Sequence, residues 1–115
     1  MILRKRLLFL PLLATALFAQ DGLKKVTPAE ASAAVASKIA PEYPALGKQL
    51  KIEGRVELEA VVSETGTVEK VNIVSGNPVL TRPAAEAVKH WKFVPFVDGG
   101  KTCKAVAPLS INFKL

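Results

Sequence analysis

The pattern of apolar and polar residues is most regular in the middle of the chain. In residues 55–63, Val56, Leu58, Ala60 and Val62 fall on one face, whereas Arg55, Glu57 and Glu59 fall on the other. This period of two predicts a half-buried strand. Glu64-Thr65-Gly66 has turn chemistry, because Gly66 tolerates a positive φ angle, and residues 67–75 predict a second strand with Val71 and Ile73 on its inner face. The two strands are expected to form a hairpin.

Three segments show helical spacing. Thr27-Pro28-Ala29-Glu30 predicts a capped helix start, followed by an alanine-rich helix over residues 29–39 that Pro41 ends. Tyr43-Pro44 opens a shorter helix to about Leu50, with Leu46 and Leu50 expected on its inner side. The third helix covers residues 82–92, with Thr81 as its expected cap and Ala84, Val88 and Trp91 as its core stripe.

The chain closes with an apolar segment over residues 105–115. Its apolar members are Val106, Leu109, Ile111 and Phe113. Pro108 cannot donate to a β-ladder, so this strand is expected to have an open edge, a bulge or a late start near Leu109. After residue 41 the order is α-β-β-α-β, which predicts an α+β fold. We expect a small antiparallel three-stranded sheet with helices packed on one face, plus an extra N-terminal helix.

The first residues are typical of a leader. Arg4-Lys5-Arg6 precede an apolar stretch from Leu7 to Ala19, and 13 residues are too few for a bilayer-spanning helix, which takes roughly 20. We therefore predict a signal peptide at 1–19, a linker and N-terminal helix at 20–40, and one domain at 41–115. A retained, uncleaved signal anchor is the alternative.

Charge and composition limit the classes of function that we expect for this chain. Three of the charges in the net +6 belong to the leader, which leaves 13 basic and 10 acidic side chains without a basic run, so no nucleic-acid partner is expected. His90 and Cys103 are single residues of their kinds, too few for a zinc site, and nothing marks an oxyanion site beside them. We expect no metal, no cofactor and no enzymatic activity. A small hydrolase or redox enzyme stays open as a minor alternative, tested by a His90→Ala, Cys103→Ala double variant.

Several short motifs occur in a characteristic order along the domain. They are Pro41-Glu-Tyr43-Pro44, Gly54-Arg-Val56, Gly66-Thr-Val68, Ser75-Gly76-Asn77, Trp91-Lys-Phe93 and Ile111-Asn-Phe113. Each is common alone, but together they resemble the TonB carboxy-terminal domain family across residues 41–115. The resemblance implies an energy transducer module in the periplasm, or at the inner membrane if the anchor is retained. This chain has no long proline-rich spacer, which suggests a short, freestanding member of the family.

The resemblance also implies how the domain binds. Its partner would be an extended N-terminal segment of an outer-membrane TonB-dependent transporter, added as a strand beside the last strand of the sheet, which is β-augmentation. The partner-binding residues implied are Tyr43, Pro44, Val106, Leu109, Ser110, Ile111, Asn112 and Phe113. Contact with inner-membrane motor proteins is left open. The main alternative is a self-associating structural domain without a transport role, in which the same edge pairs in a homodimer.

Overall fold

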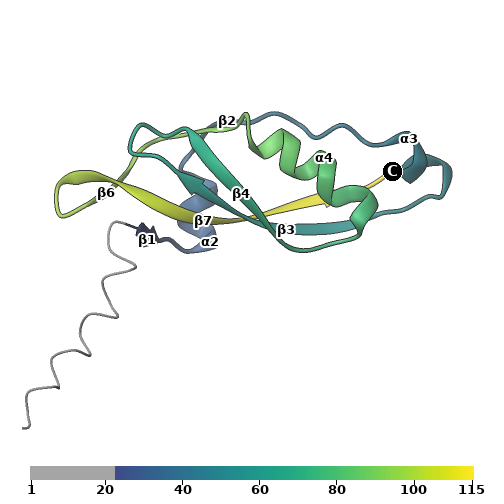
Figure 1. The fold of residues 1–115 in the computed structure, drawn as a ribbon, viewed down its shortest axis with the longest axis horizontal. Helices are drawn as coiled ribbons and strands as arrows, with labels where there is room; N and C mark the ends of the chain where they lie inside the picture. The colour runs from purple at the N-terminus through teal and green to yellow at the C-terminus, as the bar shows by residue number, and fades with distance from the viewer. Residues whose placement is uncertain (1–22) are drawn as a thin grey trace, which may run out of the picture.

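The computed structural model describes residues 23–115, so the predicted signal peptide and its cleavage site lie outside the described residues. These residues form a twisted sheet, and the longest of the helices described lies along one face of it (Figure 1). Among the residues described, no helix is both long and apolar enough to cross a bilayer.

Three long strands form the antiparallel body of the sheet. They are β3 (Gly54–Val62), β4 (Val68–Ser75) and β7 (Lys101–Phe113), and β3 lies between the other two. The predicted hairpin of β3 and β4 is confirmed, with Gly66 at φ 90° in its turn. The pairing of β3 with β7 runs without a register shift from Gly54 opposite Phe113 to Val62 opposite Ala105.

Two short strands enlarge the sheet beyond the prediction. β6 (Phe96–Asp98) forms a hairpin with the start of β7, and β1 (Leu23–Lys25) pairs in parallel with the middle of β7. Within residues 23–115 the sheet therefore has five strands and is mixed, because β1 runs parallel to β7, so the prediction of a fully antiparallel sheet of three strands is wrong. A separate two-stranded sheet joins β2 (Val35–Ser37) to β5 (Lys92–Phe93).

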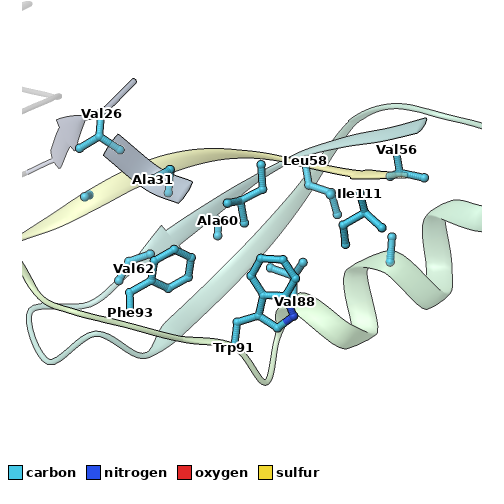
Figure 2. Close-up of a cluster of buried hydrophobic side chains, with 14 of the residues drawn as sticks. Val26, Ala31, Val56, Leu58, Ala60, Val62, Val88, Trp91, Phe93 and Ile111 are labelled. Carbon is cyan, nitrogen blue, oxygen red and sulfur yellow. The ribbon is translucent and has the colours of Figure 1, made fainter. Parts of the chain in front are cut away.

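The core lies between the sheet and α4 (Pro78–Val88). The predicted inward residues of β3 are buried, and they meet Ala84, Val88 and Trp91 from the α4 side (Figure 2). Phe93 and Phe96 join the same cluster. The helix begins earlier than expected, because the side chain of Asn77 caps the amide of Val79, and Pro78 fits the first turn. It ends at Val88 rather than 92, since Lys92 and Phe93 pair with β2.

The N-terminal helix α2 (Pro28–Ala33) has the predicted capping box of Thr27 and Glu30 but is shorter than expected. It stops at Ala33 because Val35 pairs with Phe93, so a continuous helix to residue 39 was wrong. Helix α3 (Ala45–Gln49) follows Pro44 as predicted, yet Leu46 and Leu50 are exposed. Gly47 is the buried member of α3, because the Tyr43 ring lies directly against it. Ile73 of β4, expected to face inward, is 43% exposed.

Candidate functional site

The two sides of β7 have different backbone partners. The amide of Val26 donates to the carbonyl of Val106 at 3.2 Å, so the backbone groups of Val106 face away from β3. Because backbone groups alternate along a strand and the β3–β7 register is unbroken, those of Pro108, Ser110 and Asn112 also face away from β3.

This alternation explains how Pro108 fits within a long strand. Pro108 lies opposite Glu59, in a pair that exchanges no backbone hydrogen bonds, so its missing N–H leaves the β3–β7 ladder intact. Neither a bulge nor a late start occurs there. Of the three outcomes expected for this proline, the open edge is the one the structure contains.

We define the outer edge as the side of β7 away from β3 over residues 107–113. On that side, residues 104–106 are paired with β1. Over the outer edge itself, no strand within residues 23–115 pairs with β7. Ser110 and Asn112 therefore present an amide and a carbonyl each, whereas Pro108 presents a carbonyl alone. Such a row of unpaired groups can accept another extended backbone.

The predicted site residues of β7 divide between two faces. Leu109, Ile111 and Phe113 point into the core and are at most 8% exposed, so they anchor β7 to the core. Ser110 and Asn112 are exposed on the opposite face, and Val106 is half-buried there. The Ser110 hydroxyl donates to Glu57 at 3.1 Å, and Glu57 also pairs with Arg55. The exposed face beside the outer edge is therefore polar.

Tyr43 and Pro44 lie at the far end of β7. The Tyr43 ring packs edge-on against Phe113 with 5.5 Å between ring centroids, and its hydroxyl donates to the carbonyl of Ile52. Burial of the hydroxyl raises the pKa of Tyr43, and the negative charge of Glu53 adds to this effect. Pro44 is the N-cap residue of α3. Tyr43 thus braces the end of β7, and Pro44 marks the start of α3.

A cavity of about 300 Å³ opens beside Pro108 and Ser110. Pro28 and Ser32 of α2 form one wall, and Lys38 and Trp91 form another. The Lys38 ammonium lies 5.4 Å from the centre of the Trp91 ring. The sequence did not predict the wall formed by α2, because the capping box at Thr27 predicts a helix but not where that helix docks. We name this space the edge pocket.

The other candidate chemistry stays apart from this edge. His90 is exposed after α4, and Cys103 is a half-buried free thiol near the β6–β7 turn. Within residues 23–115, no three His, Cys, Asp or Glu side chains gather in a group that could hold a metal ion. The described residues therefore contain no arrangement that suggests metal chemistry.

Residues 39–115 match the family model described as the Gram-negative bacterial TonB protein C-terminal. The chain is similar to Protein tonB2 of Pseudomonas aeruginosa, with 38% identity over 78 residues, which cover 66% of this chain and 29% of that protein. It is also similar to Protein TonB of Vibrio cholerae, with 33% identity over 85 residues, which cover 72% of this chain and 35% of that protein. The matched region is thus about a third of these relatives' length.

Among solved structures, the solution NMR structure of the Pseudomonas aeruginosa TonB CTD has a similar fold. The TM-score is 0.58 at 26% identity, and the match covers 70% of this chain and 84% of that one. The shared architecture is a mixed α+β fold.

Proposed function

The chain belongs to the TonB C-terminal family, and on that premise we propose that it is a periplasmic module that binds extended segments of outer-membrane TonB-dependent transporters by strand addition. The outer edge of β7 is the proposed docking site, and energy-dependent transport across the outer membrane is the proposed process.

The single observation that supports this proposal is the unpaired backbone of the outer edge. Ser110 and Asn112 offer alternating donors and acceptors in the spacing that an added strand requires. Their neighbours Leu109, Ile111 and Phe113 are fixed in the core, so the edge is already in its extended conformation before a partner arrives. A preorganised edge loses little conformational entropy on binding.

The side chains around the edge would supply selectivity. The edge pocket is lined by the apolar side chains of Trp91 and Pro108 and by the polar side chains of Ser32 and Lys38. A side chain of the added strand could enter it, while the backbone pairs with Ser110 and Asn112. Tyr43 and Pro44 would hold the end of β7 and the start of α3 in place.

We further propose the division into a signal peptide at 1–19, a linker and N-terminal helix at 20–40, and the binding domain at 41–115, with β1, α2 and β2 of the middle segment packed against that domain. The periplasm would be the site of action after cleavage of the leader. A contact with inner-membrane motor proteins would belong to the complete transport system rather than to the outer edge.

The test is a titration of the isotope-labelled protein with synthetic peptides from the N-terminal periplasmic segments of outer-membrane TonB-dependent transporters. We expect a binding peptide to shift the amide resonances of Ser110 and Asn112. Ser110→Pro should abolish binding, because it removes an amide that faces the partner and leaves the β3 ladder intact. Ser110→Ala is the matched control, since it removes the hydroxyl and keeps the amide.

Self-pairing of the same edge is distinguished by sedimentation. A monomer over a hundredfold range of concentration, together with peptide shifts at residues 107–113, supports the proposal. A dimer that Ser110→Pro dissociates, with no peptide response, would instead establish a self-associating domain.

A further inference from the structure

The chain already adds one strand of its own to the side of β7 that the partner would use. β1 runs parallel to β7, with Leu23 opposite Lys104 and Lys25 opposite Val106, directly before the outer edge begins. Val26 continues this line and donates its amide to Val106. Two strands cannot occupy one side of β7 together, because paired strands lie about 4.8 Å apart. A partner strand that extends past Pro108 toward Lys104 must therefore replace β1.

β1 is held much more weakly than the residues that follow it. Leu23 and Lys25 are exposed and Lys24 is half-buried. Within residues 23–115, the one side-chain hydrogen bond of β1 runs from the Lys24 ammonium to the Val97 carbonyl, at an exposed site. Beyond it, Val26 is only 6% exposed, and Ala31 of α2 is fully buried (Figure 2). The capping box of Thr27 and Glu30 then fixes the start of α2. Release of residues 23–26 would thus expose one buried valine and could leave α2 docked.

We propose that β1 is an internal competitor for the partner strand, which covers Lys104 and Val106 and limits the partner to the outer edge while it is bound. The inference rests on the proposed function and adds a regulatory element to the same site. With β1 in place, the edge has three outward-facing residues, Pro108, Ser110 and Asn112. With β1 released, Lys104 and Val106 join them, and both contribute an amide as well as a carbonyl.

Because of the position of β1 in the chain, the segment that precedes it can influence this competition. β1 immediately follows residue 22, so whatever binds or pulls the segment before it acts first on this short, exposed strand. Partner affinity would then depend on the state of that preceding segment.

A pair of proline variants tests the proposal. The Val26 amide faces β7, so by alternation the Lys24 amide also faces β7 and the Lys25 amide faces away. Lys24→Pro should therefore release β1, and Lys25→Pro should leave it paired. Lys24→Ala controls for the lost bond to Val97, because it keeps the amide. Val26→Ser is a second route to release, because it weakens the apolar anchor without a proline.

Amide hydrogen exchange reports the release itself. We expect Lys104 and Val106 to exchange slowly in the wild type and in Lys25→Pro, and to exchange quickly in Lys24→Pro. Ala105 and Ala107 face β3 and should stay protected in all variants, which also shows that the sheet remains folded.

Peptide affinity then decides the inference. For a transporter peptide that shifts Ser110 in the wild type, we expect roughly three- to tenfold tighter binding to Lys24→Pro, with new protection at Lys104 and Val106. Lys25→Pro should bind as the wild type does. Equal affinity for all variants, although exchange shows β1 released, would overturn the internal competitor and leave the proposed function standing. Absence of binding to every variant would overturn both.

Discussion

The Tyr43 ring meets Phe113 at an interplanar angle of 85°, which joins the segment before α3 to the last residue of β7. The two residues are far apart in sequence, and their contact closes the end of the core nearest the outer edge. The Tyr43 hydroxyl fixes the same ring to the backbone of Ile52. The end of the proposed docking strand thus depends on a side chain from another element.

Tyr43→Phe should keep the ring contact and lose the hydrogen bond to Ile52. The lost bond leaves a carbonyl without its partner, so we expect Tm to fall by about 4–8 °C. The raised pKa of Tyr43 means that the folded state favours the protonated phenol, so its contribution is present at neutral pH and is lost as pH rises above 10. Thermal melts at pH 7 and pH 11 measure both effects, and a wild type that loses no more stability than Tyr43→Phe at pH 11 would contradict this explanation.

Gly66→Ala should be strongly destabilising. A Cβ at this position would lie 2.0 Å from the carbonyl oxygen of Phe93, and the φ angle of 90° is unfavourable for alanine. We expect a loss of about 3 kcal/mol or more in the free energy of unfolding, measured by urea denaturation. Gly99→Ala is the matched control, since its φ is also positive at 62° but no atom lies within 4 Å, and about 1–2 kcal/mol is expected there. Similar losses for both variants would contradict a steric cause at Gly66.

Leu58→Ala should create a cavity under the centre of the sheet. Leu58 is 1% exposed and belongs to the cluster between β3 and α4, so a loss of about 2–5 kcal/mol is expected. Leu50→Ala removes the same atoms from a side chain that is 61% exposed, and it should change the free energy by less than about 0.5 kcal/mol. Chemical denaturation of the two variants side by side provides the comparison; equal effects would be inconsistent with the core described.

Because of the capping box of α2, the free energy of unfolding should depend on pH in the acid range. The pKa of the Glu30 carboxyl lies below its usual value of 4.5, mainly because the Thr27 amide donates to it, with a further contribution from the Thr27 side chain. A lowered pKa in the folded state stabilises the fold above the unfolded value, and this contribution is lost as pH falls through the folded value. Glu30→Gln should therefore show a shallower loss of stability between pH 6 and pH 3 than the wild type. Glu64→Gln, in the exposed β3–β4 turn, serves as the control, and a profile that differs no more for Glu30→Gln than for Glu64→Gln would rule out this role.

Local sequence patterns predicted the parts of the fold that depend on nearby residues. The alternation over Val56 and Val62, the turn at Gly66 and the stripe of Ala84 and Val88 each need only a few neighbouring positions, and all are confirmed. The capping box at Thr27 is confirmed for the same reason. Hydrophobic period and turn chemistry are local properties, so they can be recognised without the tertiary structure.

The incorrect predictions concern residues whose environment is set by distant segments. The helix expected to reach residue 39 ends where Val35 meets Phe93, and Leu46 is exposed because Gly47 lies against the Tyr43 ring. β1 owes its strand conformation to Lys104 and its neighbours, about 80 residues later. No local pattern contains this information.

The candidate site was predicted in part. Residues 105–115 were identified as the closing strand, and Pro108 was identified as the residue that requires an exception. The side of β7 that Pro108 faces, and therefore which amides stay available, follows only from the register with β3. The edge pocket could not be predicted, because its walls come from α2, Lys38 and Trp91, three parts of the chain that meet only in the folded domain.

The thirteen residues of β7 also determine when the domain can fold during its synthesis. β1, β3 and β6 all pair with this strand, so β1 and β6 have no partner in the sheet, and β3 has only β4, until residues 101–113 have been made. A growing chain on the ribosome therefore carries an incomplete sheet until its final segment emerges. Such late, non-local closure is a slow step in folding, because the entropy of a long loop is lost before the strand pairs of β7 form.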